Sequence, residues 1–433
     1  MTISFSHMAN AIRALSMDAV QAANSGHPGM PMGMADVATV LYTKHLKYDP
    51  TWPEWPNRDR FILSAGHGSM LLYSLLYLTG YKSPTIEDIK NFRQLNQPCA
   101  GHPEYDELAG VEMTTGPLGQ GLASSVGFAL AERLSNARMG DVIDHHTYVI
   151  CGDGCLMEGI SHEAISMAGH LKLGKMIVLW DDNEICIDGS TSATVSDDQI
   201  ARFSASGWHV QAINGHDAEE IDAAIEAAKQ DDRPSMIACR TTIGYGAPTK
   251  QGTAGAHGAP LGVDEIAAAR KMLDWPHAPF VIPEDILGAW AEAGKRSQDI
   301  AEQWKIAFDG LDEEIKTDFN RRLNNQLPAN LEGAINAFKK DLAENPVKVA
   351  TRKASQMALD VINPIVQETI GGSADLTGSN LTKTADQDTI TGQDFTGRYK
   401  YYGVREFGMS AIMNGLALHG EYIPYGGTFM VFT

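Results

Sequence analysis

The feature that most constrains the fold is an alternation of short apolar runs with stretches of helical periodicity, which continues to about residue 250. Each run ends in Gly, Asp, Asn or His, as in RFILSAGHG, HTYVICGDG, KMIVLWDDN, WHVQAINGHD and SMIACRTTIG. Helical spacing marks the intervening segments Leu118–Ala137, Gly159–Leu171 and Ala218–Lys229. Strands that alternate with helices form right-handed βαβ units. The pattern therefore predicts an α/β fold with parallel sheets flanked by helices, whose ligands bind at the carboxyl ends of the strands.

The length of the chain requires more than one domain. Its 433 residues exceed the roughly 100–200 residues of a single domain. The alternation stops near Pro276, helices then dominate, and a strand, a helix and a strand follow again after a looser segment. We expect a first domain at residues 1–323, a helical linker at 324–346 and a second α/β domain at 347–433. This second domain is expected to be incomplete, because the chain ends within an apolar run at Thr433.

Charge and the lack of targeting signals limit the possible classes of function. The chain has 34 basic and 54 acidic residues, a net charge of −20. This argues against a nucleic-acid binder, which needs a basic surface, and against an anionic membrane as partner. The five cysteines do not form a secreted disulfide framework. The sequence has neither a signal peptide nor the roughly 18 consecutive apolar residues of a membrane helix, so a cytoplasmic protein is expected.

Two of the predicted strand ends carry side chains with oxygen ligands. In CGDGCLMEG, glycines flank Asp153, and the next strand ends in DDNEICIDG, which contains Asn183. The crossover rule makes the two strands parallel neighbours, so both side chains emerge at one edge of the sheet. With a backbone carbonyl of the second loop they predict a site for Mg²⁺ or Ca²⁺. An EF-hand is excluded because Ile185 occupies a position that needs an oxygen side chain. Two solvated turns are the alternative.

A glycine-rich turn, GPLGQG, opens the helical stretch within Gly116–Leu134. Backbone N–H groups and a helix N-terminus favour an anion at such a turn. It is not a P-loop, because no Lys-Ser or Lys-Thr follows the second glycine. Alone, the glycines equally fit tight helix packing. Combined with a cation at Asp153, the turn predicts a diphosphate held by both the metal and the helix N-terminus.

Four histidines lie in glycine-flanked loops, SGHPG, SAGHGS, AGHPE and GAHGAP; they are His27, His67, His102 and His257. One loop histidine is more often a surface residue than a catalyst, but four in this context indicate a site. Neutral imidazoles bind hydroxyls and transfer protons near neutral pH.

The second domain offers weaker signals. YGVREFGMSAIMNG places Glu406 at a strand-to-helix junction, where its simplest role is a helix-start glutamate favoured by the helix dipole. Phe429 and Phe432, in GGTFMVFT, are most simply core residues of a strand.

These motifs together resemble the transketolase family of thiamine-diphosphate enzymes. The resemblance extends in order along nearly the whole chain, through ANSGHPGMPMG, LSAGHGSMLLY, GHPE, TTGPLGQG, GDGCLMEGISHEA, ATRK, SADLTGSN and VREFGM. It implies the thiamine-diphosphate-binding fold of two domains, with the diphosphate and metal bound in residues 1–323 and the pyrimidine in residues 347–433.

The resemblance also implies the ligands of metal and cofactor. The cation, Mg²⁺ or Ca²⁺, would be bound by Asp153, Asn183 and the carbonyl of Ile185. The residues implied to contact thiamine diphosphate are Gly116, Leu118, Gly154, Glu158, Asn183, His67, Phe429 and Phe432. Phe432 would stack on the pyrimidine ring, and Glu158 and Glu163 would link the two active sites of a homodimer.

For catalysis, the resemblance implies that Glu406 bonds the ring nitrogen of the aminopyrimidine and is kept protonated by burial against Phe429 and Phe432. The other implied catalytic residues are His27, His67, His102 and His257. The implied substrate-binding residues are His27, His257, Arg352, Ser379 and Asp375. Arg352 suits a sugar phosphate because guanidinium binds phosphate bidentately.

The implied reaction is the ping-pong transfer of a two-carbon ketol unit through a thiamine-bound enamine, as in the pentose phosphate pathway. The donor would be a ketose phosphate of the xylulose 5-phosphate type and the acceptor an aldose phosphate of the ribose 5-phosphate type. Deoxyxylulose-phosphate synthase and dihydroxyacetone synthase are sister alternatives, which the His27 and His257 loops disfavour. Because the family's second domain continues beyond TFMVF and a third domain follows it, a non-catalytic cofactor-binding fragment is the alternative from another class.

Overall fold

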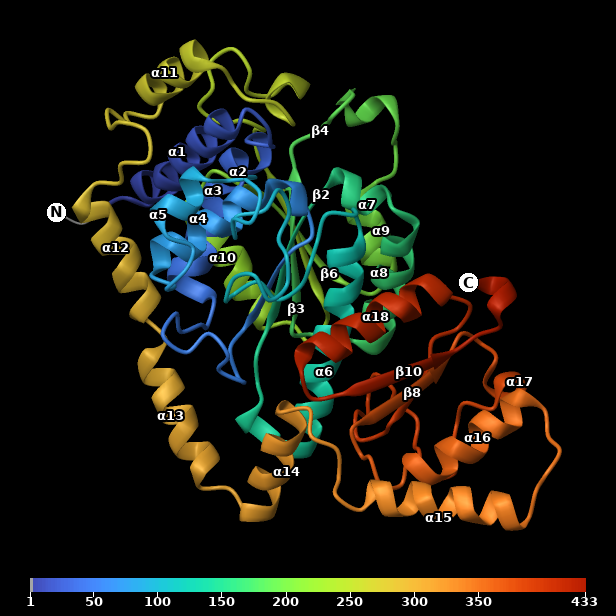
Figure 1. Ribbon diagram of the computed structural model, residues 1–433. Helices are drawn as coiled ribbons and strands as arrows, with labels where there is room; N and C mark the ends of the chain where they lie inside the picture. The colour runs from blue at the N-terminus through green and yellow to red at the C-terminus, as the bar shows by residue number, and fades with distance from the viewer. Residues whose placement is uncertain (1–2) are drawn as a thin grey trace. The chain divides into compact units, whose positions relative to one another are not determined.

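Two structural units make up residues 3–433, the residues that the computed structural model describes (Figure 1). The first unit runs to Leu122 and resumes over His145–Gln303, and the second comprises Ala123–Asp144 and Trp304–Thr433. Helix α6 (Gln120–Met139) therefore begins in the first unit and continues into the second. Each unit contains a parallel sheet.

The sheet of the first unit consists of the five predicted strands. They are β1 (Arg60–Leu63), β2 (Thr147–Gly152), β3 (Met176–Asp182), β6 (His209–Asn214) and β7 (Ser235–Arg240). Their order is β1-β2-β3-β7-β6, and all neighbouring pairs are parallel. Strands β2 and β3 are direct neighbours, and Gly152 pairs with Asp181. The two turns that follow them therefore leave the sheet at the same edge.

Helices cover both faces of this sheet, with α1, α3, α4 and α10 on one side and α8 and α9 on the other (Figure 1). The helices that begin in the first unit, besides α6, are α1 (Phe5–Ala23), α2 (Gly29–Gly33), α3 (Ala35–Val40), α4 (Ser69–Thr79), α5 (Ile86–Lys90), α7 (Asp153–Met157), α8 (Gly159–Leu171), α9 (Gln199–Ala205), α10 (Ala218–Lys229), α11 (Val263–Met272), α12 (Glu284–Lys295) and α13 (Gln298–Asp309). A two-residue hairpin pairs β4 (Ile185–Cys186) with β5 (Gly189–Ser190).

The predicted helices at 159–171 and 218–229 have the bounds that periodicity indicated. Helix α10 shows why: Asp217 caps its N-terminus by accepting from the N–H groups of Glu219 and Glu220, which satisfies two of the orphan donors there. Its buried residues, Ile221, Ala224, Ile225 and Ala228, follow the helical repeat. Helix α6 begins two residues later than predicted, because Gly119 adopts a left-handed turn (φ +82°) before it.

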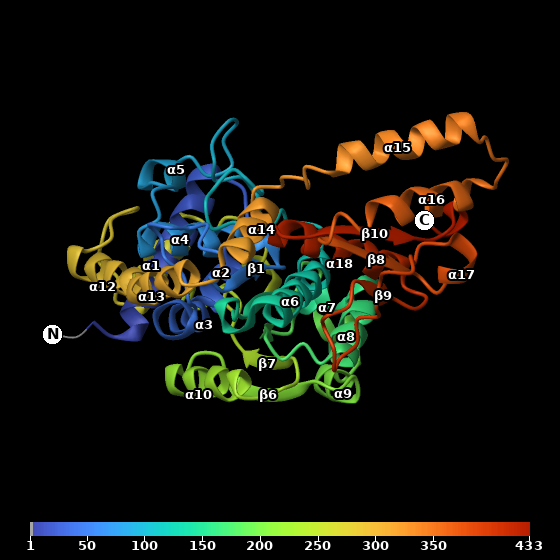
Figure 2. The ribbon, with the colours of Figure 1, turned by 90° about the horizontal axis from the view of Figure 1, so that it is seen from below.

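The second unit has a three-stranded parallel sheet in the order β10-β8-β9. Its strands are β8 (Thr369–Ser373), β9 (Tyr399–Tyr401) and β10 (Ile423–Gly427). Its helices are α14 (Glu313–Leu323), α15 (Leu331–Glu344), α16 (Thr351–Ile362), α17 (Thr377–Asn380) and α18 (Glu406–His419). Helix α15 runs beside α16 (Figure 2). Among residues 3–433, no helix is both long and apolar enough to span a bilayer.

Within the second unit, α6 and α18 pack with their backbones in contact. A Cβ on Gly127 would lie 2.1 Å from the carbonyl oxygen of Ile412, and one on Gly415 would lie 1.9 Å from that of Ser124. Only glycine allows so close an approach.

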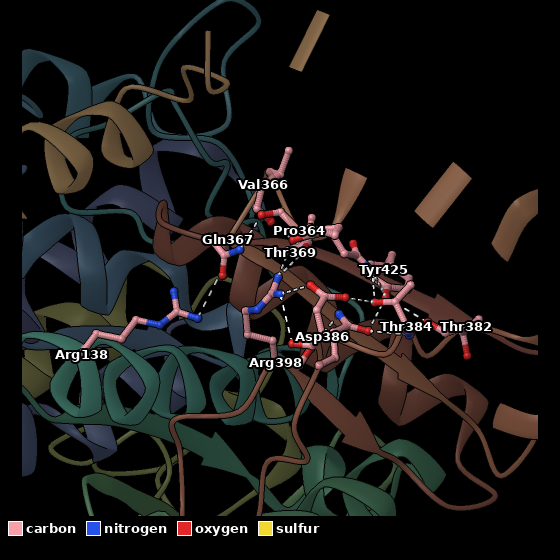
Figure 3. A network of polar contacts seen from close by, with 12 residues as sticks. Arg138, Pro364, Val366, Gln367, Thr369, Thr382, Thr384, Asp386, Arg398 and Tyr425 are labelled. Atoms are coloured by element: carbon pink, nitrogen blue, oxygen red, sulfur yellow. Dashed lines mark hydrogen bonds and ion pairs between the residues drawn. The ribbon is translucent and has the colours of Figure 1, made fainter. Parts of the chain in front are cut away.

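A buried polar network fastens the loop between α17 and β9 to the sheet of the second unit (Figure 3). Arg398 donates to the carbonyl of Asn363 at 3.0 Å and to the hydroxyl of Thr369 at 3.2 Å, and pairs with Asp386. The amide of Asn363, which is fully buried, donates to the hydroxyls of Thr384 at 3.0 Å and Tyr425 at 2.9 Å. These hydrogen bonds hold the loop, although Oδ1 of Asn363 is buried and has no hydrogen-bond partner among the described residues.

The expectation that Phe429 and Phe432 are core residues of a strand is wrong. Strand β10 ends at Gly427, where its pairing with β8 also ends, and the chain then forms a short 3₁₀ turn at Met430–Phe432. The two rings are 36% and 54% exposed, so they do not form a buried apolar surrounding for Glu406 within this chain. A continuous apolar run predicted a strand, but among residues 3–433 β10 pairs with β8 alone, and that pairing stops at Gly427.

Candidate functional site

A cavity of about 300 Å³ opens in the first unit, and residues that follow β1, β2 and β3 line it. It brings together ten of the residues that the sequence indicated: His27, His67, His102, Gly116, Leu118, Asp153, Gly154, Asn183, Ile185 and His257. These residues come from loops and element ends spread over more than half of the chain. The parallel sheet gathers them because its strands end side by side.

Asp153 is a buried carboxyl group that lines this cavity. It directly follows β2, and its Oδ1 accepts from the indole N–H of Trp180 at 3.2 Å. Its Oδ2 is buried and has no hydrogen-bond partner among the described residues. Burial, together with the neighbouring Asp181 and Asp182, raises the pKa of Asp153 to about 7. A buried carboxylate without a counter-charge is costly, and a divalent cation would supply that charge.

Asn183 and Ile185 line the cavity at the same edge and have oxygen atoms of the kind that bind a hard cation. Oδ1 of Asn183 accepts from the backbone N–H of Ile185 at 2.9 Å, within a turn in which Glu184 is left-handed (φ 62°). Over residues 3–433, no cluster of three or more His, Cys, Asp or Glu side chains is arranged for a metal. A cation here would therefore be held by a mixed set of carboxylate, amide and carbonyl oxygens, which is the donor chemistry of Mg²⁺ and Ca²⁺.

Glycines keep the space beside this edge open for a ligand. A Cβ on Gly154 would lie 2.8 Å from Cδ1 of Leu118, and one on Gly116 would lie 3.2 Å from the ring of His102. Gly116 also has a φ of +154°. The turn leads into the N-terminus of α6, where backbone N–H groups favour an anion. Together with a cation at Asp153, the turn fits a diphosphate.

Ser64 fixes the start of α6, a role that sequence reasoning missed. It follows β1, and its Oγ accepts from the N–H of Leu122 at 3.0 Å. A Cβ on Gly121 would lie 2.5 Å from Cα of Ser64, so the helix start packs directly on this strand end. A serine after an apolar run gives no signal of such a role in the sequence. Asp181, which also lines the cavity, and Thr241, which donates to it, were also missed.

Three of the four histidines form a ring cluster at the cavity. The centroids of His67 and His257 are 5.3 Å apart and the rings are stacked, whereas His27 lies edge-on to both, at 5.1 Å from His67 and 5.9 Å from His257. The Nδ1 atoms of His27 and His257 are buried and have no hydrogen-bond partner among the described residues.

Burial keeps the histidines neutral. It lowers the pKa of His27 to about 4, with Arg93 as a further cause, and the pKa of His67 to about 3, with His257 as a further cause. Burial also lowers the pKa of His102 and of His257. A neutral imidazole has one donor and one acceptor nitrogen, so the cluster can both bind hydroxyls and transfer protons at neutral pH.

The other indicated residues lie outside this cavity. Glu158 precedes α8 and is exposed, and Glu163 is half-buried within that helix. Glu406 is the first residue of α18, as predicted, and its Oε1 accepts from the hydroxyl of Thr428 at 3.2 Å.

In the second unit, Arg352 and Ser379 lie together, since the guanidinium donates to the carbonyl of Ser379 at 3.2 Å. Asp375, four residues before Ser379, adopts a left-handed conformation (φ 60°). All three residues are exposed.

Comparisons with known proteins identify the family of the chain. The family model described as "Transketolase, thiamine diphosphate binding domain" matches residues 4–328, and that described as "Transketolase, pyrimidine binding domain" matches residues 347–433. The transketolase of Cereibacter sphaeroides is 59% identical over 426 residues, which are 98% of this chain and 64% of the relative.

Solved structures show the same likeness. Transketolase from Leishmania mexicana has a TM-score of 0.94 and 41% identity, over 100% of this chain and 65% of that one. Transketolase from Pichia stipitis in complex with sedoheptulose 7-phosphate has a TM-score of 0.93 and 44% identity, over 99% of this chain and 65% of that one. The chain thus spans just under two thirds of the length of these proteins. Because the two family models together match nearly all of its residues, the chain belongs to the transketolase family.

Proposed function

We propose that this protein transfers a two-carbon ketol unit from a ketose phosphate of the xylulose 5-phosphate type to an aldose phosphate of the ribose 5-phosphate type. The observation that carries the proposal is the cavity of the first unit, which is lined both by neutral histidines and by Asp153, whose Oδ2 has no partner among the described residues. One end of this cavity suits a metal-bound diphosphate and the other a polyhydroxylated substrate. The relatives named transketolase support the same activity.

The proposed cofactors are thiamine diphosphate and Mg²⁺ or Ca²⁺. Asp153, Asn183 and the carbonyl of Ile185 would hold the cation, and the turn from Gly116 to Leu118 would hold the diphosphate, with Gly154 leaving room for it. When bound, thiamine diphosphate supplies the electron sink for cleavage of the bond beside the donor carbonyl.

The protein's own part is orientation and proton transfer. His27, His67, His102 and His257 would bind the hydroxyls of the donor and move protons there, which their neutral state permits. Arg352, Ser379 and Asp375 would hold the sugar phosphate. The exposed guanidinium of Arg352, which already lies beside Ser379, supports this role.

We assign Glu406 to the aminopyrimidine, with Phe429 and Phe432 beside that ring. Its position at the start of α18, where Thr428 orients its carboxyl group, supports the assignment. We further propose that residues 1–323 form the domain for diphosphate and metal, that 324–346 form the linker, and that 347–433 form the domain for the pyrimidine.

We also propose a cytoplasmic homodimer with active sites at the subunit interface, in which Glu158 and Glu163 link the two sites. Large apolar side chains that are exposed near Glu406 support an interface: Val404 is 75%, Phe407 56% and Met430 90% exposed. Such exposure is typical of interaction surfaces.

The test is release of glyceraldehyde 3-phosphate from xylulose 5-phosphate in the presence of ribose 5-phosphate. Release that depends on both thiamine diphosphate and Mg²⁺ is the expected result. If the protein binds the cofactor but releases no product, the proposed activity is wrong and the alternative of a cofactor-binding fragment holds.

A further inference from the structure

A buried hydrogen-bonded chain runs from Thr241 through Asp181, which lines the cavity, to Asn183. Asp181 is 1% exposed and occupies the second-last position of β3, opposite Gly152 of β2. Its carboxylate accepts from Nδ2 of Asn183 at 2.8 Å and from the hydroxyl of Thr241, which follows β7 and is 6% exposed. Residues from the ends of two adjacent strands, β3 and β7, therefore converge on one amide.

These contacts define which way the amide of Asn183 points. A carboxylate only accepts hydrogen bonds, so the group that faces Asp181 is the NH₂. A backbone N–H only donates, so the group that faces Ile185 is the carbonyl oxygen Oδ1. Oδ1 has two lone pairs and uses one on Ile185. The second lone pair is left for a cation beside Asp153, which lines the same cavity.

Packing alone does not account for a carboxylate at position 181. A buried carboxylate is costly unless its partners compensate it, and an apolar side chain would fill the same space at lower cost. Both of the described donors to Asp181 lie on the side of the metal turn: the amide of Asn183 itself, and a hydroxyl on the strand next to it. The carboxylate is thus arranged to hold one amide in one orientation.

We propose that Asp181 and Thr241 are positioning residues of the cation site, which orient Asn183 so that Oδ1 faces the metal. This inference rests on the cofactor site of the proposed function and extends it to residues that do not touch the cation. Partners behind a metal ligand typically change metal affinity about 10–100-fold.

The experiment compares Thr241→Val, which keeps the shape but loses the hydroxyl, with Thr241→Ser, which keeps the hydroxyl. Asp181→Asn is the second variant. Each purified protein is saturated with thiamine diphosphate and titrated separately with Mg²⁺ and with Ca²⁺, and the intrinsic tryptophan fluorescence is recorded; Trp180, which contacts Asp153, is the expected reporter. The thermal midpoint of the metal-free proteins is measured in parallel.

If Asp181 and Thr241 position Asn183, their substitution should weaken the binding of Mg²⁺ more than the binding of Ca²⁺. Mg²⁺ demands a nearly ideal octahedral geometry, whereas Ca²⁺ tolerates irregular sites. We expect Thr241→Val to raise the Kd for Mg²⁺ about tenfold and to raise that for Ca²⁺ by much less. Asp181→Asn should have a larger effect of the same kind. Thr241→Ser should restore the Mg²⁺ affinity.

Two results would overturn the inference. One is an unchanged Kd for Mg²⁺ in Thr241→Val and Asp181→Asn. The other is an equal loss of affinity for Mg²⁺ and Ca²⁺ together with a lower thermal midpoint, because this combination indicates a purely structural role. If the unaltered protein binds neither metal in the presence of thiamine diphosphate, the proposed cofactor site fails as well. Binding by the unaltered protein therefore separates the two failures.

Discussion

At the scale of single residues, Asp153 is expected to bind the cation at a cost in the stability of the metal-free protein. Asp153 has a buried oxygen with no hydrogen-bond partner in the part of the chain that the structure describes, and burial raises its pKa to about 7. We expect Asp153→Asn to stabilise the metal-free protein by about 1–2 kcal/mol at neutral pH, because asparagine has the same shape and, unlike the partly ionised buried carboxyl group, no charge. Urea unfolding in EDTA measures this change. Thiamine diphosphate with Mg²⁺ should then stabilise the unaltered protein and not the variant, whereas Asp188→Asn, at an exposed position of the neighbouring hairpin, should behave like the unaltered protein. A less stable Asp153→Asn variant would contradict this account.

The buried histidines make stability depend on pH. The pKa of His67 is about 3 and that of His27 about 4 in the folded protein, against an ordinary value of 6.5. Between pH 4 and 6.5 the unfolded chain therefore binds more protons, so the free energy of unfolding falls as pH falls and is fully present only above pH 6.5. We expect His67→Asn to reduce the loss of stability between pH 7 and pH 5 by about 1–2 kcal/mol. Urea unfolding at the two pH values measures it, with exposed His7→Asn as the control. An identical loss in His67→Asn and the unaltered protein would show that this imidazole is not held neutral.

At the scale of elements, the helix pair α6 and α18 depends on two glycines. The Cβ of Gly415→Ala would lie 1.9 Å from the carbonyl oxygen of Ser124, so the helices must separate, at a cost on the order of 3 kcal/mol. The matched control is Gly333→Ala in α15, where a Cβ meets nothing within 4 Å. That substitution should stabilise by about 0.5–1 kcal/mol, because alanine has the higher helix propensity. Thermal unfolding of both variants is the measurement, and equal effects at the two positions would contradict the proposed close packing.

The helices and strands were the features that the sequence predicted best. Periodicity is a local signal, so the five strands of the first sheet, α8, α10 and the start of α18 at Glu406 could all be located from it. Contacts between distant segments leave no such signal: Ser64 under α6, Thr241 behind Asn183, and the end of β10 before Phe429 depend on neighbours that only the fold supplies. It was predictable that the candidate site residues would lie close together, because the carboxyl ends of parallel strands meet at one edge of the sheet.

At the scale of the whole molecule, the remaining question is what covers the apolar side chains of α18 and the segments beside it. Phe407 is 56% exposed one residue after Glu406. If this surface is the subunit interface, Phe407→Arg should give a monomer, because a charged group buried in an apolar interface is costly. Sedimentation velocity at micromolar concentration should show twice the chain mass of 46.9 kDa for the unaltered protein and the single mass for the variant. Ile306→Arg, at a 66% exposed position in α13, is the control and should remain dimeric. Ketol transfer should be lost together with the dimer, since we propose that each active site lies at the subunit interface. If Phe407→Arg stays dimeric, the interface does not include this surface of α18. If it is an active monomer, the active site does not require a second chain.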